Sequence, residues 1–333
     1  MSIHSARSID VHAHAVLPGT MGAAGPYGPE IGADGPGRPW FRVGDYRLDG
    51  VRYRGSAFMD VDLRLDNMQA SGIEFQLLSP NPLTYFHHIE SGQAIRYCRH
   101  HNDELAALVS QHPTRLAALA SLPMQDPEAA SEELRRAVGE LGMLGACIGS
   151  ELPLALDSDL LNDFYATLCD LNVPLFIHPA PPGIDGPAGD KRLHRFELEV
   201  ILGFASQEAL TIATLILGGV MARHPTLDIC ISHGGGAIAV LADRLADATR
   251  RRPWSPDDLR QDGAFEALLS RFWLDNHVHD ESVLTLLERH VGREHIVLGT
   301  NFSGWDQPKN INVDDPQTKQ MADNARRLLR ASL

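Results

Sequence analysis

The chain is poor in cysteine and carries no excess of positive charge. Its 333 residues include only four cysteines, none in a CxxC spacing and each in an apolar segment. This pattern favours buried thiols in a reducing compartment over a disulfide framework. Asp and Glu number 43 against 29 Lys and Arg, which gives a formal charge of −14. That balance excludes a nonspecific binder of the nucleic-acid backbone.

Long apolar runs and several familiar motifs are also missing. The N-terminal segment has no apolar run of signal-peptide length, and no stretch of about 18 apolar residues predicts a membrane span. GxGxxG, Walker and GxSxG motifs are absent, so the conventional serine-hydrolase site lacks its signature. We therefore expect a cytoplasmic protein with neither a membrane nor a nucleic acid as its partner.

Short apolar runs alternate with longer amphipathic segments along the whole chain. The predicted strands cover residues 8–12, 73–79, 116–122, 144–150, 174–178, 227–233, 272–276 and 295–300. Such runs, apolar on both faces, are typical of parallel strands, and the segments 60–71, 126–141 and 206–223 between them predict helices. Eight alternating units favour an α/β fold, a single-domain (β/α)8 TIM barrel over residues 1–333, rather than a doubly wound open sheet.

Two predicted loops interrupt the alternation of strands and helices. Residues 18–57, after the first strand, are rich in Gly and Pro and predict a long irregular insertion that acts as a lid. A second loop, residues 179–191, follows the fifth strand. Both are expected at the carboxyl ends of the strands, where barrel enzymes build their active sites. A final helix, near residues 315–333, is expected to pack on the barrel or on a partner subunit.

Histidines stand where several of the predicted strands end. His12 and His14 are two residues apart on the first strand, so both side chains point to one face and form a chelating pair. With 16 histidines in the chain, this pair alone is a weak signal. His178, His233 and Asn301 close later strands, however, and in a barrel these ends converge. The pattern therefore favours a divalent metal site.

These stretches resemble the amidohydrolase superfamily, in the branch of aminocarboxymuconate-semialdehyde decarboxylase. The matching segments are IDVHAHAVLP, LLSPNP, LFIHP, LILGGVMARHPTLDICISHGGGAI, VHD at 278–280 and LERHVGREHIVLGTNF. They run from residue 9 to residue 302, which is nearly the whole chain. The resemblance implies a (β/α)8 barrel that holds one divalent ion, usually zinc, with manganese as the alternative.

The resemblance also implies roles for individual residues. His12, His14 and His178 correspond to metal ligands. His233 corresponds to the histidine that activates water or moves protons beside the metal, a role that suits a group titrating near neutrality. The glycines after it let a helix begin close to the site.

Asn301 departs from the family pattern, which has Asp after the eighth strand as a further metal ligand. Asn offers a carbonyl oxygen but no charge, so it would leave the ion more Lewis-acidic and less firmly held. Asp306 and Glu281 are the nearby carboxylates that could complete the site instead. For Glu281, a carboxylate at a helix start on the surface is the ordinary alternative.

Four residues are candidates for binding substrate. Arg54 lies near the position of a carboxylate-binding arginine in the related decarboxylase, and Arg252 matches an arginine that is donated across a dimer interface. A guanidinium suits a bidentate contact with a carboxylate, although Arg252 also fits a solvated helix end. His194 in the second loop and Asn81 after the second strand could line the pocket. These matches predict a small carboxylated, aromatic-derived substrate and a homodimer or a higher homo-oligomer.

Three reactions fit this scaffold. We expect a C–C hydrolase that acts on a carboxylated aromatic ring-fission product through metal-activated water, similar in kind to the lignin-catabolic meta-cleavage-product hydrolase of this superfamily. The long lid and Asn301 favour it. The alternatives are a nonoxidative decarboxylase of a carboxylated aromatic or muconate semialdehyde, and a hydratase of an unsaturated oxo-acid. A metal-free barrel that only binds a ligand is the noncatalytic alternative.

Overall fold

The computed structural model describes residues 2–35, 37–308 and 310–331 of the chain. Each of the eight predicted strands overlaps an observed one, and all eight run parallel to their neighbours. They are β1 (Ile9–Ala15), β5 (Phe75–Pro80), β6 (Leu116–Ala118), β7 (Ala146–Gly149), β8 (Leu175–His178), β9 (Ile229–Ile231), β10 (Trp273–Asp275) and β11 (Ile296–Val297).

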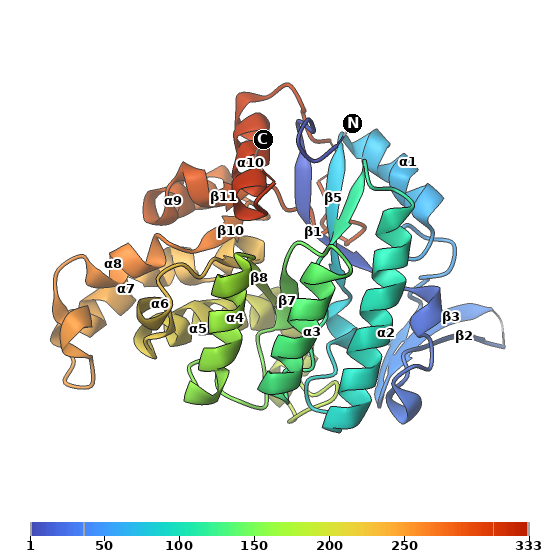
Figure 1. The fold of residues 1–333 in the computed structure, drawn as a ribbon, viewed down its shortest axis with the longest axis horizontal. Helices are drawn as coiled ribbons and strands as arrows, with labels where there is room; N and C mark the ends of the chain where they lie inside the picture. The colour runs from blue at the N-terminus through green and yellow to red at the C-terminus, as the bar shows by residue number, and fades with distance from the viewer. Residues whose placement is uncertain (1, 36, 309, 332–333) are drawn as a thin grey trace.

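These strands form two sheets that join into one barrel. One sheet has the order β1-β5-β6 and the other β11-β10-β9-β8-β7. Two isolated parallel bridges, Asp10 with Leu298 and Ala120 with Ala146, connect the sheets at both seams. The Val11 N–H also donates to the Leu298 carbonyl at 2.9 Å. The strands are buried on both faces, as the sequence predicted, because side chains fill the inside of the barrel. Helices cover its outside (Figure 1).

Ten α-helices are found in the described residues, most of them between strands of the barrel. They are α1 (Val61–Ser71), α2 (Ser91–Ser110), α3 (Pro127–Gly139), α4 (Asn162–Leu171), α5 (Phe204–Leu217), α6 (Val220–Arg223), α7 (Ile238–Arg251), α8 (Ala264–Leu269), α9 (Glu281–Val291) and α10 (Pro316–Leu328). Asp60 and Asp126 cap α1 and α3, since their side chains accept hydrogen bonds from backbone N–H groups of the first turns. The final helix packs on the barrel itself, where its apolar residues join those of β1 and β5 in one buried cluster (Figure 1).

The insertion after β1 is ordered, which corrects the prediction of an irregular segment. It contains an antiparallel sheet of β2 (Glu30–Asp34), β3 (Arg38–Val43) and β4 (Tyr46–Asp49), which Figure 1 shows beside α2. Phe41 and Val43 of β3 are buried in a cluster that also contains Tyr97 of α2. Burial of these side chains fixes the insertion against the barrel, because each large apolar residue removed from water contributes about 1.5–3 kcal/mol.

The predicted helix over residues 206–223 is longer and broken. It begins with a π-helical turn, η6 (Glu199–Gly203), continues as α5, and stops at Gly218-Gly219 before α6. The stretch Glu199–Leu217 has a mean hydropathy of 1.8 and is long and apolar enough to cross a membrane, which the sequence analysis did not anticipate. Half of it is buried against the rest of the chain. That burial is typical of a core helix packed on a barrel.

Candidate functional site

A cavity of about 630 Å³ opens at the carboxyl ends of the barrel strands. This is the end at which polar side chains of parallel barrels converge. The residues that follow or end successive strands line it: His14, Asn81, His178, His233, His277 and Asn301. The insertion and the segment before α5 complete its walls. The convergence predicted from strand ends is therefore what the fold produces.

His12, His14 and His178 form a compact cluster at the base of this cavity. Their ring centroids lie 5.3 Å apart for His12 and His14, 5.0 Å for His12 and His178, and 4.6 Å for His14 and His178. One nitrogen from each ring lies within 4.8 Å of the others. All three side chains are buried. Strand β1 supplies the first two from one face, and β8 supplies the third.

The cluster leaves three nitrogens free to bind a cation. The Nδ1 atom of His12 bonds Asp275 at 2.7 Å, that of His14 bonds Ser79 at 2.8 Å, and that of His178 bonds the Pro179 carbonyl at 2.6 Å. The three Nε2 atoms are buried without a partner among the described residues. Burial lowers the pKa of all three imidazoles, so they are neutral at pH 7. Buried, neutral and otherwise orphaned imidazole nitrogens are the donor set that a divalent ion requires.

Asp275, the last residue of β10, orients His12 and the neighbouring backbone through hydrogen bonds. Besides its bond to His12, its Oδ1 accepts the backbone N–H groups of Gly234 and His277 at 3.0 Å each. Burial would raise the pKa of Asp275, but the hydrogen bond from His12 and the surrounding imidazoles hold it well below its usual range. The carboxylate is therefore ionised, and it fixes the tautomer of His12 that presents a free Nε2.

We expect Asp275→Asn to weaken the binding of a divalent ion by about 10–100-fold, because a neutral acceptor no longer strengthens the basicity of His12. Titration of the metal-depleted protein with Mn²⁺ or Zn²⁺ against a chelator measures this change. Asp103→Asn, the same exchange at an exposed position that bonds only Arg136 among the described residues, is the control. Equal affinities for Asp275→Asn and the parent would show that this carboxylate does not support a metal ligand.

His233 lies beside the cluster and is paired with a buried acid. Its ring centroid is 4.8 Å from that of His12 and 5.0 Å from that of His178. Its Nδ1 bonds Oε1 of Glu208, from α5, at 2.7 Å. Burial opposes the protonated form, but the charge and hydrogen bond of Glu208 outweigh it and raise the pKa of His233 to about 9. Without a bound cation, the imidazole of His233 is therefore protonated at pH 7. The side chain lies at the cavity wall.

The backbone around His233 is unusually bent. His233 has φ +46°, a strained value for a residue with a side chain, and the three glycines after it also have positive φ. A Cβ on Gly236 would come within 2.3 Å of the Ala205 carbonyl oxygen. Glycine there lets the start of α7 approach α5.

Asn301 lies at the cavity with its amide held by Asp306. The Asn301 Nδ2 donates to Asp306 Oδ1 at 2.8 Å, and the other carboxylate oxygen accepts from His277 Nε2 at 2.9 Å. The hydrogen bond from His277 and that from Asn301 keep the pKa of Asp306 low despite burial. Asp306 is thus occupied by two partners. Glu281 is exposed in the first turn of α9, as expected of a surface carboxylate at a helix start.

Of the four predicted substrate-binding residues, some line the cavity and others do not. Asn81 is buried and lines the cavity, and its side chain accepts from the Leu83 N–H at 2.9 Å. Arg54 and Arg252 are exposed and line no part of the cavity in this single chain. His194 is half exposed and lies 3.2 Å from Glu199, also outside the lining. Only Asn81 is therefore brought together with the histidines.

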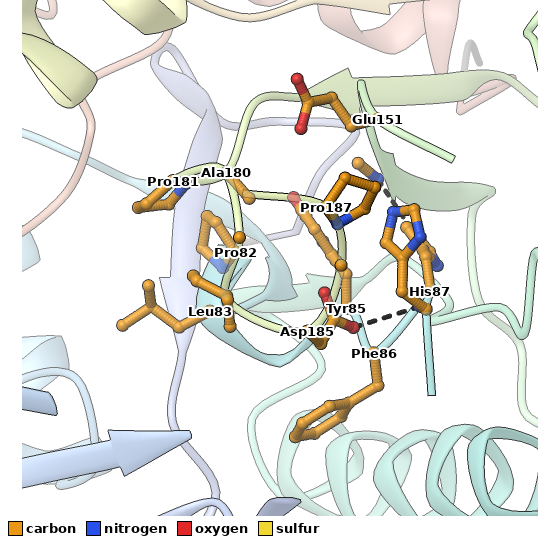
Figure 2. Close-up of a pocket in the computed structure, with 15 residues that line it drawn as sticks. Pro82, Leu83, Tyr85, Phe86, His87, Glu151, Ala180, Pro181, Asp185 and Pro187 are labelled. Atoms are coloured by element: carbon orange, nitrogen blue, oxygen red, sulfur yellow. Dashed lines mark hydrogen bonds between the residues drawn. The ribbon is translucent and has the colours of Figure 1, made fainter. Parts of the chain in front are cut away.

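The loop after β8 forms a side wall of the cavity. Pro181 lines the large cavity, while residues 183–187 fold over a separate hollow of about 30 Å³ beside His87 (Figure 2). Asp185 accepts the backbone N–H of His88 at 3.3 Å, and His87 accepts that of Gly149 at 3.0 Å, as the dashed lines in Figure 2 show. The first contact ties the loop to the segment after β5, and the second ties that segment to the end of β7.

Sequence reasoning missed three groups of the site. Asp275 ends a predicted strand as His178 does, and that position was a usable signal. Glu208 is the lone acid within an otherwise apolar helical stretch, a pattern that often marks a buried partner. His277 carried no signal of its own, because its place depends on the bend after β10.

Residues 9–331 match the model of the amidohydrolase family. The chain is 31% identical over 263 residues to the 2-amino-3-carboxymuconate-6-semialdehyde decarboxylase of Dictyostelium discoideum, covering 77% of this chain and 70% of the relative. It is 32% identical over 216 residues to the gamma-resorcylate decarboxylase of Rhizobium sp. strain MTP-10005, covering 62% and 64%. The solved dihydroxybenzoic acid decarboxylase of Polaromonas sp. JS666, with bound manganese and 2-nitroresorcinol, superposes with a TM-score of 0.75 at 24% identity, covering 97% and 96%.

Proposed function

Because the chain belongs to the amidohydrolase family, in the branch of the aminocarboxymuconate-semialdehyde decarboxylases, we propose that this enzyme is a metal-dependent nonoxidative decarboxylase of a carboxylated aromatic compound. Of the relatives named above, the Rhizobium and Polaromonas enzymes are decarboxylases of aromatic acids, and the Dictyostelium enzyme is a decarboxylase of an open-chain muconate semialdehyde. They support the decarboxylase alternative better than the C–C hydrolase that the sequence analysis favoured. The observation that carries the proposal is His233, hydrogen-bonded to the buried Glu208, beside three free histidine nitrogens.

His12, His14 and His178 would hold one divalent ion through their Nε2 atoms, and Asn301 would offer its amide oxygen. Asp306 already bonds the Asn301 amide nitrogen, which turns the Asn301 oxygen away from it. When bound, the ion supplies a Lewis acid for the carboxylate and neighbouring oxygens of the substrate. Zinc is the ion that the family resemblance favours, and manganese is the ion bound in the Polaromonas enzyme.

Loss of CO2 replaces a carbon–carbon bond by a carbon–hydrogen bond, so the reaction needs a proton at the ring carbon. A histidine kept protonated by a buried carboxylate is suited to deliver it. The relatives, rather than the protonation state of His233, favour decarboxylation over hydrolysis.

We expect the metal-loaded protein to release CO2 from hydroxylated benzoates or muconate semialdehydes. In ²H₂O, the product should carry one deuterium at the carbon that lost its carboxyl group. Mass spectrometry of products formed in ¹⁸O-labelled water is the matched control, since decarboxylation incorporates no ¹⁸O into the organic product. A ring-fission diketone cleaved to an ¹⁸O-labelled carboxylic acid would overturn the proposal and restore the hydrolase, and an ¹⁸O-labelled alcohol without cleavage would indicate a hydratase.

A homodimer is also proposed, through the face made by η6, α5 and α7. Helices α5 and α7 pack against each other, and η6, α5 and α7 all carry exposed apolar side chains. These are Ile201, Leu202, Leu210, Val240 and Leu241. Arg252 follows the end of α7, so a second copy docked on this face is what would bring it toward a neighbouring cavity.

A further inference from the structure

A second group of possible metal ligands lies on the cavity wall, outside the three-histidine cluster. It consists of His277 and His279, which follow β10, and Asp306, in the loop after β11. One nitrogen of each imidazole and one oxygen of Asp306 lie within 4.8 Å of one another. All three residues line the cavity of about 630 Å³. Neither the three-histidine cluster nor His233 makes use of this group as ligands.

The separations between these atoms suit one bound ion. The Oδ2 atom of Asp306 lies 2.9 Å from Nε2 of His277 and 3.7 Å from Nε2 of His279. Two ligands of a tetrahedral ion, each bound at roughly 2.0–2.2 Å, lie about 3.4 Å apart, and this value falls between the two observed ones. The side chain of His279 is 70% exposed, so its ring has room to rotate and close the remaining difference.

Neighbouring groups orient all three ligands. The side chains of His277 and Asp306 are almost fully buried. Asp306 accepts the amide N–H of Asn301 on Oδ1, at 2.8 Å, which leaves Oδ2 to face the two imidazoles. The ring of His279 stacks on that of Trp305, with 6.3 Å between centroids and 25° between planes. Outer contacts of this kind strengthen metal binding, because they fix the direction of the ligand atoms.

The cavity wall of this chain also carries a net negative charge. The carboxylates of Glu208, Asp280 and Asp306 line it, against the imidazolium of His233. Among the described residues the lining includes no Arg or Lys. His233 is itself paired with Glu208, so its charge is locally balanced. The field at the wall therefore attracts a cation.

We propose that His277, His279 and Asp306 bind a second divalent transition-metal ion, with zinc the preferred one. Two imidazoles and one carboxylate are a ligand set that zinc uses in sites with an open fourth position. Since all three ligands line the cavity, the open position is available to an anionic oxygen of a molecule bound there. The inference concerns ion binding and not turnover, so it stands or falls independently of the proposed decarboxylation.

The second site should hold its ion more weakly than the three-histidine cluster does. The ion must displace the proton through which His277 bonds Asp306, whereas the Nε2 atoms of the cluster have no partner among the described residues. It must also order the exposed ring of His279, which costs side-chain entropy. We therefore expect dialysis to empty the second site, so that metal content after dialysis reports the three-histidine cluster alone.

Titration of the metal-depleted protein with Co²⁺ tests the second site, with calorimetry and fluorescence as readouts. Co²⁺ has a partly filled d shell and quenches a nearby indole, and the indole of Trp305 stacks on His279. We expect a tight and a weaker binding step, with the fluorescence falling chiefly during the weaker one. Trp305→Phe should keep both steps and lose that fall. A single binding step, or a weaker step that leaves the fluorescence of Trp305 unchanged, would overturn the inference.

Variants of the ligands identify the residues responsible for the weaker step. His279→Ala and Asp306→Asn should each weaken it by more than the about 10–100-fold typical of outer hydrogen-bond partners. His279→Ala should leave the tight step unchanged, and at a side chain 70% exposed this exchange does not disturb the core.

His194→Ala is the matched control for these variants. His194 is also a half-exposed histidine beside an acid, 3.2 Å from Glu199, but among the described residues no third ligand completes that pair. This variant should keep both binding steps. A weaker step unchanged in both His279→Ala and Asp306→Asn would show that other histidines bind the second ion and that His277 and Asp306 form only a hydrogen-bonded pair.

Discussion

Replacing His178 by alanine is expected to abolish metal binding and activity together. His178 is one of only three imidazoles whose free Nε2 atoms face one another among the described residues. Loss of a direct ligand should weaken the divalent ion by more than the about 10–100-fold typical of outer hydrogen-bond partners. A Lewis acid contributes several kcal/mol, and each 1.4 kcal/mol is about tenfold in rate, so CO2 release should fall by about 1,000-fold or more.

Metal content per chain after dialysis, measured by mass spectrometry, is the direct readout for His178→Ala. Thermal unfolding of the metal-depleted parent and variant should agree closely, because the ligand change removes little apolar packing. His112→Ala, at a histidine beyond the end of α2 and outside the cavity, should keep both metal and rate. A His178→Ala protein that retains one tightly bound ion and normal turnover would refute the three-histidine site.

The histidine cluster was predictable because its members obey the geometry of strands. His12 and His14 share a face of β1, and His178 ends β8. A barrel therefore brings these side chains together, independently of the conformation of its loops. Short apolar runs mark these strands plainly in the sequence, because parallel barrel strands are buried on both faces. His233 follows the same rule, since it stands two residues after the end of β9.

The parts that escaped prediction depend on contacts between distant segments. The β2–β3–β4 sheet forms within a Gly- and Pro-rich stretch because Phe41 and Val43 are buried against α2, and local propensity does not encode that partner. The bond between Asp306 and His277 likewise joins residues 29 positions apart through two bent segments. Arg54 and Arg252 were chosen by resemblance, which fixes chain position but not the direction of an exposed side chain.

Some parts of the site can therefore be predicted from the sequence and others cannot. Residues at strand ends determine which chemistry the cavity can perform, and those positions are legible in the sequence. Parts of the cavity wall come from β4 and η6, whose backbone conformations depend on tertiary packing. The substrate is therefore harder to predict from the sequence than the metal site is.

His233→Gln is expected to lower kcat by about 10²–10⁴-fold while leaving the metal in place, because a positioned proton donor contributes about that factor. This split between activity and metal content distinguishes it from His178→Ala. In the parent, the protonated form of His233 is the active one, and a bound cation would lower its pKa. Activity should therefore decline as the pH rises through a value at or below about 9. The glutamine variant should lack this alkaline limb.

Glu208→Gln provides the second arm of this test, since it removes the charge that keeps His233 protonated and retains the side-chain volume. Its alkaline limb should move to lower pH, with kcat nearer the parent value at pH 5–6 than at pH 8. Glu151→Gln, at an exposed acid outside the cavity, should reproduce the parent profile. If Glu208→Gln left the limb in place, Glu208 would be a packing partner without influence on the proton. If His233→Gln also kept full activity, the proton would have to come from another group.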